Sequence, residues 1–491
     1  MNAALLVIFG FLALSLFLGI QARKGKDMNL EQWTVGGRGF GTIFVFLLMA
    51  GEIYTTFTFL GGSGWAYSKG GPTFYIIGYG CLAYIMSYWL LPAVWKYAKE
   101  HKLMSQSDFF VSKYKSPYLG VLVSLVGVVA LIPYLVLQLK GLGIIVSEAS
   151  YGSISSTVAI WIGVISVTVY VMISGIHGSA WTAVVKDIMI LAVVVFLGLY
   201  LPFHYYGGIQ PMFEAIEASK QGFLALPEKG QSPSWFVSTV LLTALGFYMW
   251  PHTFGSVYSA QNAKVFRKNA IIMPLYQLVL LFVFFVGFAA ILQVPGLKGA
   301  EGDLSLLRLS IQTFDPWFVG VIGAAGLLTA IVPGSMILMS AATLLAKNVY
   351  KVFVPSATDA QISNLAKYLV PVVALISLYF TFTGGDAIVT LLLMGYSLVT
   401  QLFPSLFFSL WNRNFVTKQG AAAGIIAGVA TVAYITISKS TIGTLFPSLP
   451  QAVQDLNVGI IALIINVVVM SVVSLATKGS ISVDNKKSQV A

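Results

Sequence analysis

About thirteen long apolar runs follow one another along this chain, and each could cross a hydrocarbon layer ~30 Å thick. The runs lie near residues 3–20, 40–67, 73–95, 118–147, 155–174, 180–203, 233–251, 270–293, 316–346, 366–383, 387–411, 418–437 and 457–477. Since 57% of the 491 residues are hydrophobic and 9% are charged, the chain falls among membrane proteins. We therefore expect an all-α polytopic membrane protein with about 13 transmembrane helices.

The basic residues favour one orientation in the membrane. Of the 28 Lys and Arg residues, 20 fall on one side of the predicted spans, 6 on the other side and 2 inside spans. Cytoplasmic loops carry the excess of Lys and Arg, so the rich side is predicted to be cytoplasmic. An odd number of spans then places the N-terminus outside and the C-terminus inside. The net charge of +11 is thus a topology signal, and we expect no nucleic-acid partner.

Other features narrow the class of protein further. The first run follows Met1 without a basic segment and lacks a convincing cleavage site before Gln21, so it is interpreted as a retained span. The single cysteine, Cys81, cannot form an internal disulfide. The loops contain no nucleotide, kinase or thiol motif. We expect no enzyme activity, no cofactor, no metal site, no obligate protein partner, and a location in the inner (plasma) membrane.

Four charged residues lie inside predicted spans, where a charge is costly and often functional. Glu52, in 44-FVFLLMAGEIYTTFTFLGGSGWAY-67, falls near the membrane midplane. Lys140 lies toward the outer end of its span, and Lys186 and Asp187 lie toward the cytoplasmic end of theirs. Each has a structural alternative. The two lysines could extend to the headgroups, Lys186 could pair with Asp187, and Glu52 could be a buried acid bonded to a neighbouring helix.

Glycines and hydroxyl groups surround this acid. The glycines are Gly51, Gly61, Gly62 and Gly64, and the hydroxyl residues are Tyr54, Thr55, Thr56 and Thr58. An unwound segment exposes backbone carbonyls, which is tolerated only inside protein or beside a water-filled cavity. Discontinuous helices of this kind place ion and substrate sites at the midplane of secondary transporters.

Three further helix breaks are predicted. Pro251 removes a helix donor in 244-ALGFYMWPHTFG-255, and Pro333 should kink the ninth run. The fourth break lies around Gln401. Beside Pro251, His252 could titrate or bind a substrate, although a structural role near the cytoplasmic end is the alternative.

The spacing of the breaks indicates an inverted repeat. The breaks in the second and seventh spans are five spans apart, and five spans invert topology. The repeats would cover 40–203 and 233–411, within one transmembrane domain, 1–477. The peripheral helices would be 1–20, 418–437 and 457–477, followed by a short cytoplasmic tail, 478–491.

Five segments carry a resemblance to a known family. They are 36-GGRGFGTIFVFLLMAGE-52, 105-SQSDFFVSKY-114, 175-GIHGSAWTAVVKD-187, 250-WPHTFGSVYSAQNAKVFRKNA-270 and 343-TLLAKNVYK-351. They resemble the sodium:solute symporter family, and in detail the chain looks like the bacterial monocarboxylate (lactate/pyruvate) permeases within it. The resemblance implies a leucine-transporter-like 5+5 inverted-repeat fold with extra helices, and transport by alternating access.

On the map that this resemblance implies, binding residues gather between the two broken helices. The candidate substrate-binding residues are Tyr54, Thr55, Thr56, Gln138, Lys140, Tyr248 and Gln401. The candidate ion-coupling residues are Glu52, Lys186, Asp187, Thr329 and Pro333.

The chain departs from the family pattern at the sodium site. The family's main sodium site resembles a cage of first-helix carbonyls and a hydroxyl pair, which should fall at Val332-Pro333 or one residue later, where no hydroxyl occurs. The acid that usually follows a tryptophan-threonine pair is Ala183 here. A hard cation needs about five or six oxygens, so this cage is depleted. The Lys186 ammonium could take the place of the cation, and a carboxyl in an apolar setting binds a proton more readily than one in water. We therefore favour proton coupling through Glu52, with Lys186 as its charge partner, over sodium coupling.

A cation at Lys140 would match an anionic solute as a point charge, and the hydroxyls after Glu52 could orient a hydroxy or keto group. We expect a cation-coupled importer of a small carboxylate such as lactate or pyruvate. The alternatives are a sodium-coupled symporter of a neutral amino acid or vitamin, a membrane sensor domain, and a passive channel.

Overall fold

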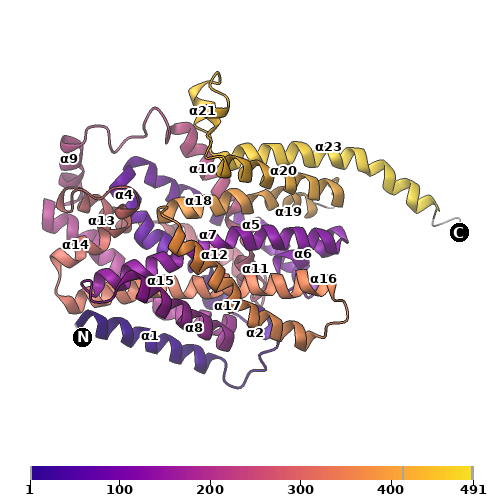
Figure 1. Cartoon of the computed structure of the whole chain (residues 1–491), viewed down its shortest axis with the longest axis horizontal. Coiled ribbons are helices and arrows are strands. Elements are labelled where there is room, and N and C mark those ends of the chain that lie inside the picture. Colours follow the sequence, from indigo (N-terminus) through magenta and orange to yellow (C-terminus); the bar gives the residue numbers. More distant parts are fainter. Residues whose placement is uncertain (1–2, 412–413, 488–491) are drawn as a thin grey trace.

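The computed structural model describes residues 3–411 and 414–487, with side chains to residue 478, and its described part is built of helices (Figure 1). Arg413, expected on the cytoplasmic side, and residues 488–491 of the expected tail lie outside the described residues. The α-helices are α1 (Ala3–Ala22), α2 (Leu30–Val35), α3 (Thr42–Ala50), α4 (Ser63–Lys69), α5 (Tyr75–Glu100), α6 (Gln106–Tyr114), α7 (Pro117–Ala149), α8 (Ser156–Tyr206), α9 (Ile209–Ser219), α10 (Pro233–Gly246), α11 (Pro251–Tyr258), α12 (Lys264–Gln277), α13 (Leu280–Gln293), α14 (Ser305–Thr313), α15 (Pro316–Thr343), α16 (Lys351–Phe353), α17 (Asp359–Thr383), α18 (Ile388–Val399), α19 (Phe403–Ser409), α20 (Lys418–Ile437), α21 (Ile442–Leu445), α22 (Gln451–Gln454) and α23 (Val458–Lys487). Short 3-10 segments are η1 (Gly36–Arg38), η3 (Gly71–Phe74), η4 (Phe247–Met249), η5 (Gly299–Leu304) and η7 (Thr400–Leu402), and π-helical turns are η2 (Phe57–Gly62) and η6 (Leu344–Tyr350).

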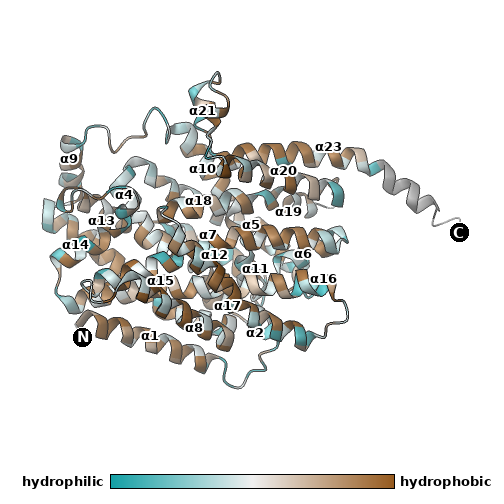
Figure 2. Cartoon of the chain, in the orientation of Figure 1, coloured by the Kyte–Doolittle hydropathy of each residue, from teal (hydrophilic) through white to brown (hydrophobic). Residues whose placement is uncertain are grey.

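Ten helices among the described residues are long and apolar enough to cross a membrane, and hydrophobic residues, brown in Figure 2, run along the long helices. One more, Pro233–Met249, is apolar but shorter. Two expected runs, 155–174 and 180–203, are merged in α8, and the run 40–67 is divided among α3, η2 and α4. The structure thus supports a polytopic helical protein, while the count of about 13 spans stays a prediction.

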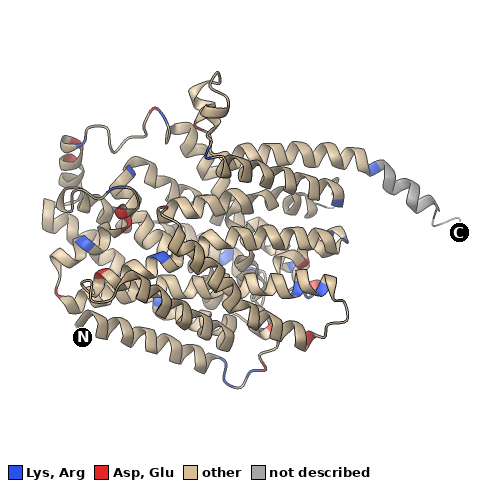
Figure 3. Ribbon diagram, in the orientation of Figure 1, with Lys and Arg blue, Asp and Glu red and all other residues tan. Residues whose placement is uncertain are grey.

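The long helices run roughly parallel, so the bundle has two ends (Figure 1). We call the end with α2, α6 and α16, on the right in Figure 1, the α6 end, and the end with α9 and α14 the α9 end. Figure 3 shows Lys and Arg residues, in blue, gathered around α16 and α6, and further charged residues along the helices of the bundle. The helices α20 and α23 pack together at one side of the bundle.

The centre of the bundle is α15, whose residues from Gly323 to Thr343 are all buried. It packs against α1, α7, α8 and α17. The helix continues through Pro333, so the kink expected there does not divide it.

The long helix α8 contains an elbow at Gly175, where φ is 51° and ψ is −146°. A Cβ atom there would lie 2.5 Å from the carbonyl oxygen of Trp33, so only glycine fits. The indole of Trp33 donates a hydrogen bond to the Val171 carbonyl at 3.0 Å, which holds α2 in this elbow. Glycine supplies the positive φ that lets the chain turn here.

The short helix α6 is tied to the end of α15. Ser105 and Asp108 form a capping box, and the Asp108 carboxyl also pairs with Lys347 and accepts a 2.8 Å hydrogen bond from Asn348 Nδ2. Burial opposes ionisation of this carboxyl, but Lys347 and these donors hold the pKa of Asp108 below its usual range. The 105-SQSDFFVSKY-114 segment therefore attaches α6 to η6, which follows α15, through a charged contact at the α6 end.

Candidate functional site

Two helices are interrupted where the sequence predicts breaks. After α3 ends at Ala50 the chain turns through residues 51–56, where the Thr58 hydroxyl donates to the Ile53 carbonyl at 2.7 Å. After η4, Trp250 adopts an extended conformation and Pro251 begins α11. A backbone bridge between Phe40 and Ala260 joins the two broken helices at the α6 end.

Glu52 lies in the first break and contacts two other helices. Its Oε2 accepts a hydrogen bond from Thr253 Oγ1 of α11 at 2.7 Å. Its backbone carbonyl accepts one from the Tyr134 hydroxyl of α7 at 3.1 Å. The other carboxyl oxygen, Oε1, is buried and has no hydrogen-bond partner among the described protein atoms. The Ser256 hydroxyl of α11, itself buried without a hydrogen-bond partner among the described residues, lies near this carboxyl, so Oε1 could hold a proton or contact Ser256 or a ligand.

Aromatic rings pack together beside Glu52, where Tyr134 contacts its backbone carbonyl. The Tyr134 ring lies 4.8 Å from that of Trp250 and 5.4 Å from that of His252, between centroids. The second break thus brings Thr253 and His252 toward the first. Both ring nitrogens of His252 and the Tyr248 hydroxyl are buried without a partner in the part of the chain that is described.

Lys186 lies at the same break, with its ammonium fully buried. Its Nζ is 2.9 Å from Asp187 Oδ1 and donates to the Tyr54 carbonyl at 3.3 Å. A Cβ atom on Gly51 would be 3.2 Å from this nitrogen. The ammonium therefore sits against the unwound residues on either side of Glu52. Of the four ion pairs found between described residues, one joins Lys186 to Asp187 and none includes Glu52, so the expected Glu52–Lys186 pair is not among them.

The predicted substrate-binding residues near the break differ in which of their polar atoms have no hydrogen-bond partner. The Tyr54 hydroxyl donates to the Tyr276 carbonyl of α12 at 2.6 Å, and Thr55 Oγ1 accepts the Phe57 amide at 3.1 Å, so both are occupied. The Thr56 amide donates to Gln138 Oε1 at 3.4 Å. Thr56 Oγ1 and Gln138 Nε2 are buried without partners among the described residues.

Lys140 lies apart from this group, at the α9 end. Its ammonium donates to the backbone carbonyl of Asp386, just before α18. The nearby Asp303 of η5 accepts the Ile388 amide at 3.0 Å and interacts electrostatically with Lys140. In this structure Lys140 therefore belongs to a contact between η5, α7 and α18.

The remaining predicted site residues make contacts within helices or between packed helices. Gln401 donates to the carbonyls of Ser397 and Gly459 at 3.0 and 3.2 Å, which ties η7 to α23. Thr329 Oγ1 donates to the Gly326 carbonyl within α15, and Pro333 is buried in the same helix.

Sequence reasoning missed two features of this region. One is Thr253, the hydrogen-bond donor to Glu52, whose signal was its position directly after the Pro-His break. The other is a hydroxyl pair, Ser179 of α8 and Ser335 of α15, whose oxygens are 2.6 Å apart. Ser335 lies just after the positions where the hydroxyl pair was sought.

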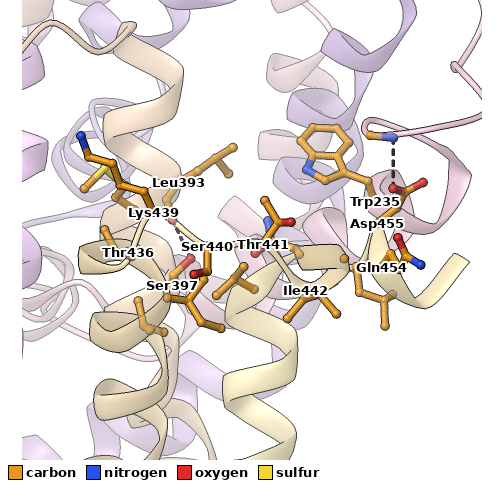
Figure 4. Close-up of a pocket in the computed structure, with 18 of the residues that line it drawn as sticks. Trp235, Leu393, Ser397, Thr436, Lys439, Ser440, Thr441, Ile442, Gln454 and Asp455 are labelled. Carbon is orange, nitrogen blue, oxygen red and sulfur yellow. Dashed lines mark hydrogen bonds between the residues drawn. The ribbon is translucent and has the colours of Figure 1, made fainter. Parts of the chain in front are cut away.

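A separate pocket of about 650 Å³ lies among α10, α18, α20 and α22 (Figure 4). Trp235, Ser397, Lys439 and Asp455 line it, and Asp455 accepts the Gly230 amide at 3.0 Å. The pocket contains none of the predicted site residues, and the Lys439 side chain in Figure 4 points away from Asp455. Over residues 3–411 and 414–487, no three or more His, Cys, Asp or Glu side chains form a group that could hold a metal ion.

Two interrupted helices bring buried charges and unpartnered polar groups together inside a polytopic bundle. This arrangement is typical of a secondary transporter. The chain belongs to the sodium:solute symporter family, whose model matches residues 33–428. It is therefore a cation-coupled solute symporter, a transporter and not an enzyme, and a multi-pass protein of the plasma membrane.

The names of individual relatives are consistent with membership of this family. The chain is 78% identical to "Uncharacterized symporter YhjB" of Bacillus subtilis (strain 168), over 97% of this chain and 98% of that protein. It is 33% identical to "Uncharacterized symporter YodF" of the same organism, over 90% of each chain. It is 29% identical to "Monocarboxylate transport permease protein" of Rhizobium johnstonii (strain DSM 114642 / LMG 32736 / 3841), over 87% of each chain.

Solved structures show the same fold. A substrate-bound, outward-open Na⁺-coupled sialic acid symporter matches with a TM-score of 0.79 at 18% identity, over 97% of this chain and 98% of that one. Mhp1, a nucleobase-cation-symport-1 family transporter in a closed conformation, matches with a TM-score of 0.57 at 12% identity, over 90% of this chain and 95% of that one. The leucine-transporter-like architecture expected from the sequence is confirmed.

Proposed function

We propose that this symporter imports a small monocarboxylate, such as lactate or pyruvate, together with a proton, by alternating access. The observation that carries the proposal is the Glu52 carboxyl, with one oxygen bonded to Thr253 and the other unpartnered in the described structure. A neutral carboxylic acid can donate from that second oxygen, whereas a carboxylate there would leave a buried charge uncompensated. Loading and release of a proton would thus change what Glu52 can bind.

Lys186 supports a coupling ion other than sodium. Its ammonium donates to the Tyr54 carbonyl and lies beside Gly51, within the unwound segment. A tethered cation in this position satisfies carbonyls that a free metal ion would otherwise bind. Lys186, paired with Asp187, would then stay beside the unwound segment while Glu52 takes up and releases a proton.

The substrate class is supported by free polar groups and by one relative. Thr56 Oγ1, Gln138 Nε2, the Tyr248 hydroxyl and the His252 ring could hydrogen-bond a carboxylate and an adjacent oxygen. The Rhizobium relative is named as a monocarboxylate transport permease and aligns over 87% of this chain. Lys140 at the α9 end would attract the anion as it enters and would not hold it at the break.

A sodium-coupled symporter of a neutral amino acid or vitamin is the second candidate. The Ser179–Ser335 pair favours it, because these two hydroxyl oxygens lie 2.6 Å apart between α8 and α15 and could join a cation cage. The depleted family positions at Val332 and Pro333 argue for the proton instead.

We also propose about 13 spans with the α6 end in the cytoplasm, the N-terminus outside and the C-terminus inside. This count follows if α8 crosses twice about Gly175, and if α3–α4 and α10–α11 each cross once. The two inverted repeats would then be 40–203 and 233–411. The helix α23 continues to Lys487, past the expected end of the last span.

Uptake in proteoliposomes tests the proposal. A counterflow panel of small acids would identify the substrate, and proton and sodium gradients imposed separately would identify the coupling ion. We expect lactate or pyruvate to accumulate with an inward proton gradient and without sodium. Glu52→Gln should lower the accumulation ratio to about 1 while counterflow persists, because the side chain can no longer exchange a proton.

The matched control is Glu228→Gln, which removes an exposed carboxyl at the α9 end and should leave accumulation unchanged. Full proton-driven accumulation by the Glu52→Gln variant would refute the proposed coupling. Accumulation that requires a sodium gradient would favour the second candidate.

A further inference from the structure

A pocket of about 570 Å³ opens at the α6 end, between the loop after α1, the helix α2, the start of α3, and α8. We call it the loop–α8 pocket. Its lining includes Lys26, Asn29, Gln32, Phe44, His177 and Trp181. None of these residues takes part in the Glu52 site, so the pocket is separate from it.

One side of this pocket is lined by basic residues that form no ion pair with a described acidic residue. Lys26 donates to the Ala22 carbonyl at the end of α1, at 2.7 Å, and His177 Nε2 lies 3.0 Å from Gln32 Oε1. Arg23 and Lys24 line the adjoining hollow over residues 20–26 together with Lys26. No carboxylate of the described chain comes within 4.0 Å of these three cations.

The acid nearest in sequence does not cancel this excess. Asp27 lines the pocket but also lies near Lys367, whose ammonium donates to the Met28 carbonyl at 3.0 Å. The pocket and the adjoining hollow are thus lined by three cations and one acid, and Lys367 lies with Asp27, Glu31 and Asp359 in a neighbouring pocket. The positive potential is unbalanced by protein groups, so the pocket suits an anion.

The residues of α3 and α8 that line the pocket are largely aromatic. Phe44 stacks edge-on against Trp181 with ring centroids 5.2 Å apart, and Phe40 packs against the His177 ring at 5.4 Å. Trp181 is 47% exposed, so its ring is open to a ligand or to the membrane. Tryptophan in such a position is typical of the headgroup level of a membrane.

We propose that the loop–α8 pocket binds an anionic phospholipid. Its phosphate group would lie among Lys26, Arg23 and Lys24, and its acyl chains would lie along Trp181. Basic pockets between transmembrane helices commonly hold anionic headgroups. The exposed Trp181 ring argues for a lipid, because a free phosphate would use only the cationic part.

This lipid would stabilise the elbow of α8. His177 follows Gly175 by two residues, and α2, which carries Gln32, is held in the elbow through Trp33. A headgroup that bridges the loop after α1 to this region would hold α1, α2 and α8 together. The inference is independent of the substrate and of the coupling ion.

Thermal unfolding of the purified full-length protein in a neutral detergent tests it. Phosphatidylglycerol or phosphatidylcholine is titrated in, and the Tm is followed. We expect phosphatidylglycerol to raise the Tm by several degrees and phosphatidylcholine to have little effect. In Arg23→Ala/Lys26→Ala, the phosphatidylglycerol concentration for half-maximal stabilisation should rise ~25-fold, at about five-fold per cation removed.

The matched control is Lys264→Ala/Lys268→Ala, which removes two exposed cations from α12 and should respond like the wild type. Arg23→Lys/Lys26→Arg keeps the charges and should also respond like the wild type, which separates a headgroup site from a folding defect. Equal stabilisation by both lipids, or an unchanged response of Arg23→Ala/Lys26→Ala, would overturn the proposal. Equal stabilisation by millimolar inorganic phosphate would overturn the lipid as the ligand.

Discussion

Lys186 and Asp187 form an ion pair at 2.9 Å that is almost wholly removed from solvent. Taking one partner away from a buried pair leaves the other charge uncompensated, which typically costs ~3–5 kcal/mol. We expect Lys186→Met to lower the unfolding free energy by about this amount. The double variant Lys186→Met/Asp187→Asn should recover a large part of the loss, because neither charge remains.

Unfolding of the purified variants in detergent, followed with temperature or denaturant, measures this coupling. A double variant as unstable as Lys186→Met alone would show that the lysine acts through packing and not through its charge.

Asp303 of η5 makes the α9 end sensitive to pH. Burial raises the pKa of Asp303 to about 7, although the Ile388 amide and Lys140 oppose this shift. An acid whose folded pKa lies above its unfolded value stabilises the fold most at low pH, and that stability falls as pH rises toward the folded pKa. We expect the packed arrangement of η5 to weaken from about pH 4 to pH 7, by about 4 kcal/mol at most.

Hydrogen exchange of residues 299–304, corrected for intrinsic rates, measures this change. Asp303→Asn should remove the pH dependence, whereas Asp386→Asn, which removes an exposed carboxyl between α17 and α18, should keep it. A pH-dependent profile that survives in Asp303→Asn would assign the effect to another group.

Among the secondary-structure elements, α8 has an elbow that depends on a single residue, Gly175. In Gly175→Ala the new Cβ would lie 2.5 Å from the Trp33 carbonyl oxygen and side chain, and φ would stay positive. Strained backbone of this kind costs ~1–3 kcal/mol, and displacement of α2 adds to it. We expect the Tm to fall by several degrees in a thermal unfolding assay.

Gly10→Ala is the control for this elbow variant. Nothing lies within 4 Å of a Cβ atom at Gly10 in α1, so alanine should keep or raise the Tm. An unchanged Tm in Gly175→Ala would mean that α2 can move away without cost.

For the whole molecule, the prediction is the orientation in the membrane. In a Cys81→Ser background, Lys229→Cys before α10 and Lys268→Cys in α12 place single thiols at opposite ends of the bundle. An impermeant maleimide added to intact cells should label the first thiol, and should label the second only after the membrane is opened. The reverse pattern would invert the proposed topology.

Much of this protein could be predicted from its sequence, because the signals are local. The length of an apolar run decides whether a helix spans a membrane, and glycine and proline interrupt helices within a single segment. The glycines around Glu52 and the proline at Pro251 each predicted a helix break, and the structure has a break at both places. It has none at Pro333, since α15 is packed on all sides and continues through it.

Only the tertiary structure decided which of the buried groups meet. Lys186 and Tyr54 are 132 residues apart in the chain, Glu52 and Thr253 are 201 apart, and Lys140 and Asp386 are 246 apart. No local pattern specifies such pairs, because they depend on how several helices pack at once. Residue type and depth therefore made Glu52 and Lys186 candidates for one site, and the packing of α7, α8 and α11 brought them to the same break while leaving Lys140 at the α9 end.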